Sequence, residues 1–401
     1  MHHLRTCPGQ RDLSYGFGAH GSETSQLSHL RGSGRPPMPR TLESHWPAAL
    51  LRGPTVTVHA LVVGLGSIGQ RHARNLRTLL GDELVLSALR SRPSGFVVTD
   101  QLDRSEQRPD ADCDGGVFFD LDEALAGRPD IVVVSTPTSL HLRFVEAAVL
   151  AGSAVFVEKP ISHDMDGVAE LANLIVDRGA TVAVGCQLRF HPSLIDLERL
   201  VRQGVPGQLI TVDVEQAEYL PSYHPYEDYR SSYAARRDLG GGVLLTQIHE
   251  LDYLQWLFGV PTRVFAMGGR IGNLEIDVED SVSALLAQDF QGHPLAVRLH
   301  LDYLQRPPRR TCRVVGEDAS IHVDLRNPST TVTDNAGNIV QHDEYPEFSR
   351  SELFLKEMSE FLAAARGERS VTVDFAHAVD TLRTASAIRT SMETGQAQDL
   401  R

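Results

Sequence analysis

One segment constrains the fold more than any other, because it places three glycines between a buried strand and a helix. An apolar strand is expected over Val56–Val63, and Gly64-Leu65-Gly66-Ser67-Ile68-Gly69 follows it. In this context G-x-G-x-x-G predicts a dinucleotide-binding turn: the first glycine allows a tight turn, the second lets a pyrophosphate approach the backbone, and the third lets the helix pack close to the strand. The phosphates would meet the positive end of the helix. A purely structural glycine turn is the alternative. The residues expected to contact the cofactor here are Gly64, Gly66, Ser67, Ile68 and Gly69.

The rest of the chain divides into three regions. Residues 1–53 are rich in Gly, Pro, Ser and His without hydrophobic periodicity, which predicts a disordered extension; a transit peptide is the alternative. Residues 54–190 alternate apolar strands with helices, as in a doubly wound, parallel Rossmann sheet covered on both faces. Residues 191–401 are expected to form an α+β domain with a large, mostly antiparallel open sheet, in which strands follow one another with turns between them. Its C-terminal helix could pack back on the first domain.

The elements expected in the two domains can be written as residue ranges. In the first, strands are predicted at Leu84–Leu89, Ile131–Ser135, Ala154–Glu158 and Thr181–Leu188, and helices at Ile68–Leu80, Leu121–Ala126, Leu140–Ala151 and Met165–Arg178. In the second, strands are predicted at Leu209–Tyr219, Arg263–Arg270, Val282–Asp289, Leu295–Leu304, Thr311–Val315 and Ser320–Asp324, with a hairpin tip at 335–338. Helices are predicted at Gly242–Phe258, Ser351–Ala365 and Phe375–Thr394.

Composition narrows the class of partner. A net charge of −14 argues against nucleic acid or an anionic membrane as a main partner. The apolar runs are too short, or too interrupted by charge, to span a bilayer. The four cysteines are scattered, without C-x-x-C spacing, so neither a disulfide framework nor a metal site is indicated. We expect a cytoplasmic protein with a small-molecule substrate.

Two loops follow strands of the predicted parallel sheet. Thr136, Pro137 and His141 come after the strand that ends near Ser135, and the carboxyl ends of such strands line the ligand groove. We therefore expect these three residues to line the cofactor site. A helix-start histidine satisfied by local hydrogen bonds is the alternative for His141.

Lys159 follows the next strand, in Glu158-Lys159-Pro160. Only two of the 38 basic residues are lysines, so a lysine inside a motif is expected to be needed as lysine. At this edge its ammonium could stabilise the alkoxide that forms as an alcohol gives up a hydride. A surface ion pair with Glu158 is the alternative. We expect both residues to lie in the cofactor site.

A third constellation follows the run Gly240-Gly241-Gly242. His249 and Asp252 lie on one side of the predicted helix, away from its apolar stripe. A histidine beside a carboxylate suits proton exchange with a hydroxyl, because its pKa lies near neutrality. A structural histidine is the alternative.

The chain resembles the glucose–fructose oxidoreductase, inositol dehydrogenase and MocA family in a series of motifs. In order along the chain these are G-L-G-x-I-G-x-x-H, T-P-x-x-x-H, E-K-P and G-G-G-x-L with a downstream H-x-x-D. The resemblance covers about Thr55 to Gln398. It implies a Rossmann domain plus an α/β domain whose open sheet often carries an oligomer interface, hence a homodimer or homotetramer. It also implies NAD(P)-dependent oxidation or reduction at a secondary alcohol of a sugar or cyclitol.

The resemblance assigns roles to particular residues. Lys159 matches the family's active-site lysine and His249 its catalytic histidine. Many members place an Asp four residues before that histidine, where this chain has Leu245. Thr246 could take that carboxylate's place, or Asp252 or Glu250 could compensate.

Other candidates lie near the domain junction and before the glycine run. Gln187 and Arg189 lie where the family links its two domains, and Gln187 is expected near the cofactor and Arg189 near the substrate. Tyr226 and Asp228 belong with Tyr229, Arg230 and Tyr233 to an aromatic and basic loop suited to a polyol or its phosphate. A solvated loop is the alternative. From this loop, the substrate candidates are Tyr229, Arg230 and Tyr233.

The second strand bears on the cofactor. An acid at its end would bind the ribose 2′-hydroxyl of NAD, but here Arg90, Ser91 and Arg92 follow. Two guanidiniums and a hydroxyl suit a 2′-phosphate, so NADP(H) is favoured over NAD(H).

Two rival functions remain open from the sequence. One is a reductase of an unsaturated or imine-like substrate, as in biliverdin reductase and dihydrodiol dehydrogenase relatives. The other is a non-catalytic NAD(P)-binding regulator. The paired Lys159 and His249 favour alcohol chemistry over both.

Overall fold

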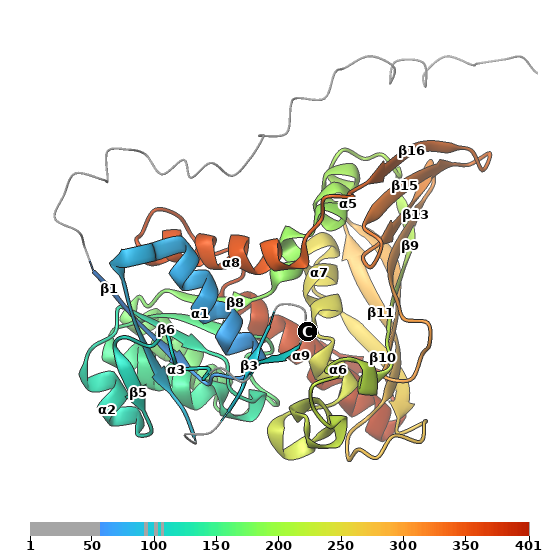
Figure 1. Cartoon of the computed structure of the whole chain (residues 1–401). Helices are drawn as coiled ribbons and strands as arrows, with labels where there is room; N and C mark the ends of the chain where they lie inside the picture. Colours follow the sequence, from blue (N-terminus) through green and yellow to red (C-terminus); the bar gives the residue numbers. More distant parts are fainter. Residues whose placement is uncertain (1–56, 92–94, 100–102, 106–107, 401) are drawn as a thin grey trace, which may run out of the picture. The chain divides into compact units, whose positions relative to one another are not determined.

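The first domain is a parallel sheet with helices on both faces (Figure 1). In the computed structural model, which describes residues 57–91, 95–99, 103–105 and 108–400, its six strands take the order β5-β2-β1-β6-β7-β8. The strand order reverses between β1 and β6, which creates the crevice where doubly wound sheets bind ligands. The strands are β1 (Val58–Val63), β2 (Leu84–Leu89), β5 (Gly116–Phe118), β6 (Ile131–Val134), β7 (Ala154–Glu158) and β8 (Val182–Gly185). The expected extension over residues 1–53 lies outside the described residues.

Alternate residues of β1 belong to two separate cores. Leu61 packs in one core with Val145 of α3 (His141–Ala151), and Val62 packs in the other with Phe361 of α8 (Arg350–Ala365). Because both faces are covered, the strand needs apolar side chains in both directions, which explains its lack of polar alternation. The helices of this layer are α1 (Ser67–Leu80), α2 (Leu121–Ala126), α3 (His141–Ala151), α4 (Val168–Arg178) and, from the C-terminal region, α8 (Arg350–Ala365).

The second domain is a nine-stranded sheet in the order β16-β15-β14-β13-β9-β12-β11-β10-β17. All its neighbours pair antiparallel except β9 with β12, which pair parallel. The strands are β9 (Leu209–Ala217), β10 (Arg263–Gly269), β11 (Ser281–Phe290), β12 (His293–Asp302), β13 (Arg309–Gly316), β14 (Ala319–Asp324), β15 (Ser329–Asp334), β16 (Ile339–Glu344) and β17 (Gln398–Asp399). The hairpin tip expected at 335–338 joins β15 to β16.

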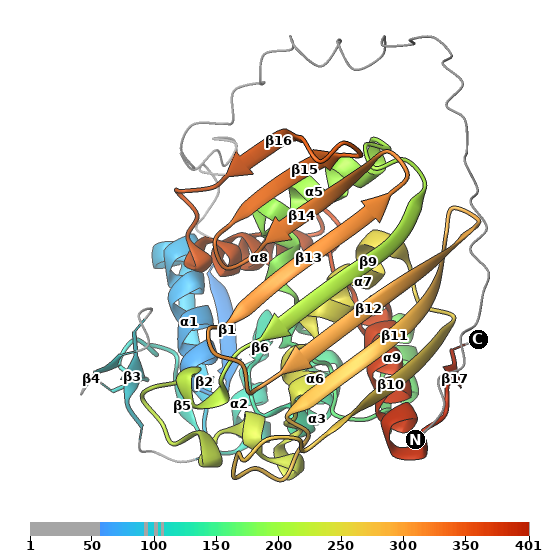
Figure 2. The same ribbon diagram turned by 90° about the vertical axis from the view of Figure 1, so that its right-hand side faces the viewer.

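Only one face of this sheet carries helices. Figures 1 and 2 show α5 (Pro192–Arg202), α7 (His249–Phe258) and α9 (Phe375–Thr394) on one side and a bare face on the other. Along β11, Val282 and Leu286 are buried under the helices, while Leu285 is 54 % exposed on the bare face. Met267 of β10 is also exposed there. Among the described helices, none is both long and apolar enough to cross a membrane.

Three predicted elements differ from the structure by a break or by three residues, while other boundaries shift by one or two residues. The helix expected over Gly242–Phe258 is two helices, α6 (Val243–Thr246) and α7, because Gln247 leaves helical geometry at φ −100° and ψ 29°. Its side-chain nitrogen donates to the Tyr223 hydroxyl at 2.6 Å, a tertiary bond that holds the break. The strand expected over Thr181–Leu188 ends at Gly185, and a 3₁₀ turn follows. The helix expected from Met165 begins at Val168.

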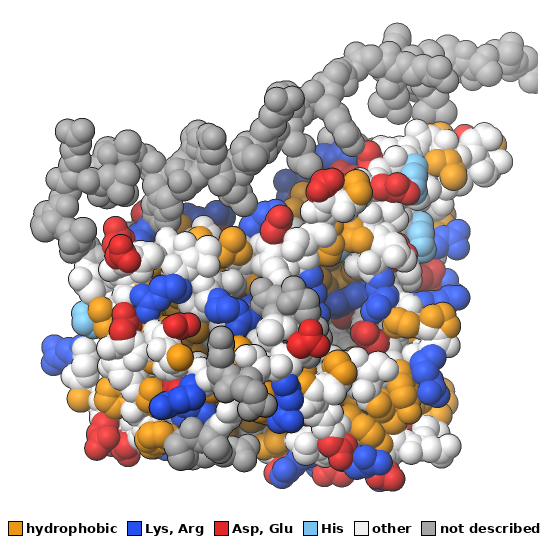
Figure 3. All heavy atoms as spheres, viewed as in Figure 1, with side chains coloured by type: hydrophobic (Ala, Val, Ile, Leu, Met, Phe, Trp, Pro, Cys, Tyr) orange, Lys and Arg blue, Asp and Glu red, His pale blue; other side chains and the backbone are white. Residues whose placement is uncertain are grey.

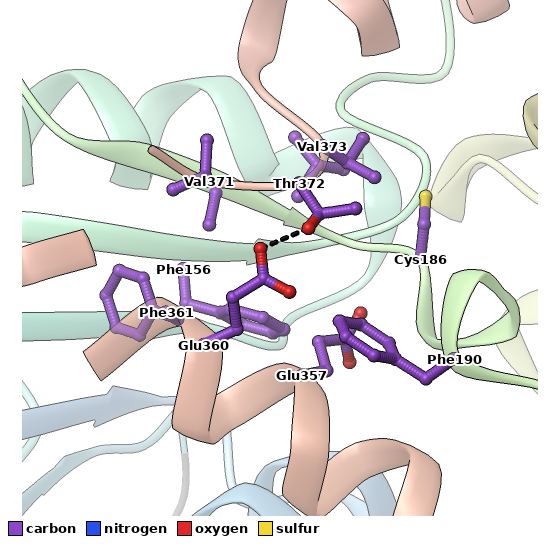
Figure 4. A pocket seen from close by; sticks show the side chains of 11 residues that line it. Phe156, Cys186, Phe190, Glu357, Glu360, Phe361, Val371, Thr372 and Val373 are labelled. Carbon is purple, nitrogen blue, oxygen red and sulfur yellow. Dashed lines mark hydrogen bonds between the residues drawn. The ribbon is translucent and has the colours of Figure 1, made fainter. Parts of the chain in front are cut away.

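A cavity of about 20 Å³ lies where α8 packs beside β7 and β8 (Figure 4). Glu357 of α8 lines it and is 6 % exposed. Burial raises the pKa of Glu357 well above its usual range, and the carboxylates of Glu158, Asp252 and Glu360 add to this by repulsion. The neutral form of Glu357 is therefore favoured in the folded protein.

Glu357→Gln should remove a pH-dependent loss of stability. The pKa is higher in the folded than in the unfolded state, so the wild type loses stability as pH rises above the unfolded value, because unfolding then releases a proton. Relative to wild type, the glutamine variant should therefore become progressively more stable as pH rises from about 5 to about 8. Urea unfolding at both pH values measures this, with the exposed Glu352→Gln of the same helix as control. The same pH dependence in wild type and Glu357→Gln would show that the native carboxyl is ionised.

Candidate active site

The glycine turn after β1 has a shape that accepts a dinucleotide. Gly64 has φ +92°, and a Cβ on Gly69 would lie 1.9 Å from the Gly64 carbonyl oxygen, so both positions require glycine. A Cβ on Gly66 would meet no atom within 4 Å, so the space in front of its backbone is open. Ser67 and Ile68 then begin α1, whose first N–H groups have no partner within the helix. The residues present therefore fit a bound pyrophosphate.

His141 fastens together the two loops that follow β6 and β7. Its Nδ1 lies 2.8 Å from the Pro160 carbonyl oxygen and its Nε2 lies 2.9 Å from that of Thr136. The imidazole is 1 % exposed. This geometry favours the alternative of a locally satisfied histidine over a direct contact with cofactor. Thr136 and Pro137 remain at the carboxyl edge of β6.

Glu158 and Lys159 point to different partners. A Glu158 carboxylate oxygen lies 2.7 Å from Nε2 of His72 in α1, and both side chains are buried. Lys159 Nζ donates to the carbonyl oxygen of Thr246 in α6 at 2.7 Å. Glu158 and Lys159 therefore do not form the surface ion pair considered from the sequence. Glu158 instead contacts α1, and Lys159 contacts α6. Sequence reasoning gave His72 no role, although it lies three residues after the last glycine of the fingerprint.

His249 is the first residue of α7, just after the break. The side chain is 5 % exposed, and Nδ1 has no hydrogen-bond partner among the described residues. Burial lowers the pKa of His249 well below its usual range, and the positive charges of Lys159, Arg310 and Arg350 lower it further. The neutral imidazole, which can accept a proton, is the favoured form.

Both acidic neighbours of His249 have partners of their own, and no hydrogen bond joins either of them to the imidazole among the described residues; that Asp252 or Glu250 compensates for Leu245 stays a prediction. The Glu250 carboxylate accepts two hydrogen bonds from Arg310, at 2.7 and 3.1 Å. The Asp252 carboxylate is taken up by Arg189 and a second histidine. Thr246 takes part through its backbone carbonyl, which accepts from Lys159.

Arg189 joins the two domains, a contact the sequence did not predict, and its expected role near the substrate stays a prediction. Its Nε and Nη2 donate to the two Asp252 carboxylate oxygens at 2.8 and 2.9 Å. His377 of α9 lies 3.1 Å from the same carboxylate, and Arg189 and Asp252 are 6 % and 1 % exposed. Burial alone would raise the pKa of Asp252, but Arg189 and His377 outweigh it and lower the pKa. Gln187, which begins the same 3₁₀ turn after β8, is also buried.

The aromatic and basic loop meets the glycine turn through a residue outside the predicted substrate set. Burial raises the pKa of Tyr226 against an opposing effect of the Ser67 side chain, and the Tyr226 ring packs edge-on against that of Phe96, 6.1 Å between centroids. The Tyr229 hydroxyl accepts from the backbone N–H of Glu275 at 3.3 Å, and the exposed Arg230 ion-pairs with the Glu275 carboxylate. Tyr229 and Arg230 therefore both contact Glu275, another residue of the second domain.

Tyr233 begins a short 3₁₀ helix beside the glycine run, where a Cβ on Gly241 would lie 2.3 Å from its carbonyl oxygen. Sequence reasoning missed a further aromatic and amide cluster nearby. Tyr223 accepts from Gln247, and its ring packs edge-on against that of Tyr303 at 5.8 Å between centroids. The contacts join residues 24 to 80 positions apart, which no local pattern signals.

The end of β2 carries one paired arginine. Arg90 ion-pairs with Asp110, which is 7 % exposed and also accepts from Arg108 at 3.0 Å. Ser91 is exposed, and Arg92 lies outside the described residues. The Asp110 carboxylate thus partly neutralises the positive charge of the Arg90 guanidinium.

Comparisons with known proteins agree with this architecture. Residues 58–186 match the family model described as "Oxidoreductase family, NAD-binding Rossmann fold", and residues 195–322 match the GFO/IDH/MocA C-terminal domain. The chain is 31 % identical over 206 residues to inositol 2-dehydrogenase of Agrobacterium fabrum, covering 50 % of this chain and 54 % of that protein. It therefore spans about half the length of that relative.

Two further proteins are similar over most of the chain. The UDP-N-acetylglucosamine 3-dehydrogenase of Acidithiobacillus ferrooxidans is 24 % identical over 339 residues, which is 83 % of this chain and 96 % of that one. The crystal structure of the WlbA dehydrogenase from Bordetella pertussis in complex with NADH and UDP-GlcNAcA has a TM-score of 0.69 at 21 % identity, covering 86 % of this chain and 99 % of that one.

The chain thus combines a Rossmann domain that matches the NAD-binding oxidoreductase model with an open-sheet domain, and Lys159 of the first contacts Thr246 of the second. The chain belongs to the GFO/IDH/MocA family.

Proposed function

We propose that the protein transfers a hydride between a nicotinamide cofactor and a secondary alcohol or ketone of a sugar, sugar derivative or cyclitol. One observation carries this proposal. Lys159, from the carboxyl edge of β7, reaches across to Thr246, so its ammonium lies within electrostatic reach of the neutral His249. A cation and a proton acceptor beside a dinucleotide turn are the groups that alcohol oxidation requires. The names of the inositol and UDP-N-acetylglucosamine dehydrogenases support the same chemistry.

In the oxidation direction, the two residues divide the work at the substrate hydroxyl. His249 accepts the hydroxyl proton, for which its neutral form is required. Lys159 stabilises the negative charge that develops on the same oxygen, and its bond to the Thr246 carbonyl holds it in place before reaction. The nicotinamide, when bound, supplies the hydride acceptor. The expected nicotinamide site borders the carboxyl ends of the parallel strands. At or just beyond these ends lie Thr136, Pro137, Glu158 and Gln187.

We further propose that NADP(H) binds more tightly than NAD(H). Arg90 and Ser91 come where an NAD-selecting acid would stand, with Arg92 next in sequence. The Arg90–Asp110 pair lessens the positive charge offered to a 2′-phosphate, so we expect a modest preference.

Turnover with a substrate panel tests both parts of this function. Purified protein is given neutral sugars, cyclitols, sugar acids, sugar phosphates and nucleotide sugars, each with NAD or NADP, and nicotinamide reduction is followed. We expect reduction with at least one polyol class and a higher kcat/KM with NADP. A higher kcat/KM with NAD would contradict the cofactor preference alone. No reduction with any class, and no oxidation of NAD(P)H by the matching ketones, would contradict the proposed chemistry.

A further inference from the structure

Arginines from three other parts of the chain act electrostatically on Arg350 in the first turn of α8. Arg350 begins that helix, while Arg71 comes from α1, Arg310 from β13, and Arg326 follows β14. Arg71 Nη1 donates to the hydroxyl of Ser351 at 2.9 Å. In Figure 3, Lys and Arg side chains gather where α8 and the sheet domain meet. In a chain with a net charge of −14, such a concentration of positive charge is a local feature.

Two of these arginines have carboxylate partners, whereas Arg350 has none within the described part of the chain. Arg310 pairs with Glu250, and Arg326 pairs with Glu218 at 3.2 Å. Among the described residues, no carboxylate oxygen lies within ion-pair distance of Arg350, whose guanidinium carbon lies 5.9 Å from the centre of the Phe354 ring.

The surroundings of Arg350 favour an anion. The side chain remains open to solvent, yet the enclosing protein lowers its pKa, and repulsion from Arg310, Arg71 and Arg326 lowers it further, against a smaller opposing effect of Glu218. A guanidinium held among others, with donors open to solvent, is stabilised when a carboxylate or phosphate approaches, and its planar fork suits both groups.

The cluster adjoins the proposed catalytic pair. Arg310 is bonded to Glu250, the residue next to His249. Lys159, Arg310 and Arg350 all act on the same imidazole, lowering its pKa by repulsion. The cluster and the proposed reacting site therefore belong to one electrostatic environment.

We propose that Arg350 binds an anionic group of the substrate, a carboxylate or a phosphate ester, with Arg71, Arg310 and Arg326 supplying the surrounding positive field. The substrate is thus an acidic sugar or cyclitol derivative and not a neutral polyol. This inference rests on the proposed function and narrows its substrate class. The cofactor phosphates have other places, at the start of α1 and beyond β2.

Calorimetric titration tests the inference without requiring turnover. Protein saturated with NADP is titrated with D-glucuronate, D-glucose 6-phosphate and UDP-N-acetylglucosamine, and with D-glucose and myo-inositol as neutral counterparts. We expect at least one anionic compound to bind about 10- to 100-fold more tightly than the neutral ones, since a hydrogen bond to a charged group contributes about 1.5–3 kcal/mol. Comparison of the carboxylate with the phosphates identifies which anion is preferred. Equal affinity for anionic and neutral compounds would overturn the proposal.

Three substitutions complete the test. Arg350→Ala should lose most of the preference for the anion and bind the neutral compounds unchanged. Arg350→Lys should keep part of the preference for the anion, because lysine retains the positive charge but lacks the planar fork of the guanidinium. Arg202→Ala, which removes an exposed arginine of α5, is the control and should change neither. An unchanged preference in Arg350→Ala, or a loss of NADP affinity in that variant, would remove Arg350 from the substrate site.

Different results would contradict the hydride-transfer function and the anion site at Arg350. If the anionic compounds bind through Arg350 but no nicotinamide is reduced, the hydride-transfer function fails and the anion site stands. If a neutral polyol turns over with the same KM in wild type and Arg350→Ala, the function stands and the anion site is wrong.

Discussion

Lys159→Ala and His249→Ala are each expected to lower turnover by about 10²–10⁴ while leaving NADP(H) affinity close to that of wild type. The lysine stabilises charge that develops only in the transition state, and the histidine moves a proton in the same step. Neither group is needed to hold the dinucleotide, whose turn lies at Gly64–Gly69. Lys159→Arg should fail as well, since a guanidinium cannot replace a compact ammonium at one oxygen.

The controls for this prediction come from the same chain. Lys356 is the only other lysine, and it lies exposed on α8 beside Glu352, so Lys356→Ala should keep full turnover. Steady-state rates and cofactor titration of all variants make the comparison. The double variant should lose less than the product of the single losses, because both residues serve one event. Near wild-type turnover in His249→Ala would remove the imidazole from the mechanism.

Asp252→Ala is expected to lower the free energy of unfolding by about 3–5 kcal/mol, the largest stability effect predicted here. The change leaves the Arg189 guanidinium buried without its carboxylate at the junction between the domains. Urea unfolding at neutral pH measures it. Arg383→Ala, which breaks an exposed pair with Asp380, should cost no more than about 1 kcal/mol.

The outcome also separates the two roles considered for Asp252. If the carboxylate served only proton transfer, Asp252→Ala would unfold like wild type and lose turnover alone. A stability loss below about 1 kcal/mol would contradict the structural role. Joint replacement of Arg189 and Asp252 by Leu should recover much of the loss, because no unpaired charge would remain.

The missing carboxylate before His249 has a visible consequence. Leu245 is 1 % exposed, and His249 Nδ1 has no partner among the residues the structure describes. The buried imidazole is therefore positioned by packing at the start of α7.

Much of the fold could be predicted because it depends on local patterns. Val58–Val63 lacks polar alternation because both its faces are covered, and the glycines after it are required by φ and by close contact. The alternation along β11, with Val282 buried and Leu285 exposed, likewise follows from a sheet covered on one face. Such features are determined within a few residues and can be read from them.

The rest of the site depends on contacts between distant residues. Arg189 meets Asp252 across 63 positions, and His72 meets Glu158 across 86. The break at Gln247 is held by Tyr223, which interrupts a helix that the apolar spacing alone would continue. Sequence patterns place such residues on elements, but the pairing depends on how the two domains pack, which periodicity does not determine.

Single-turnover hydride transfer tests the central claim most directly. Wild type and Lys159→Ala are saturated with NADP, mixed rapidly with a polyol derivative that the wild type oxidises, and followed at the nicotinamide absorbance. We predict an unchanged substrate-binding phase and a hydride-transfer phase about 10²–10³ slower in the variant. Equal hydride-transfer rates in the two proteins would contradict the assignment of Lys159 to the reacting oxygen and, with it, the proposed active site.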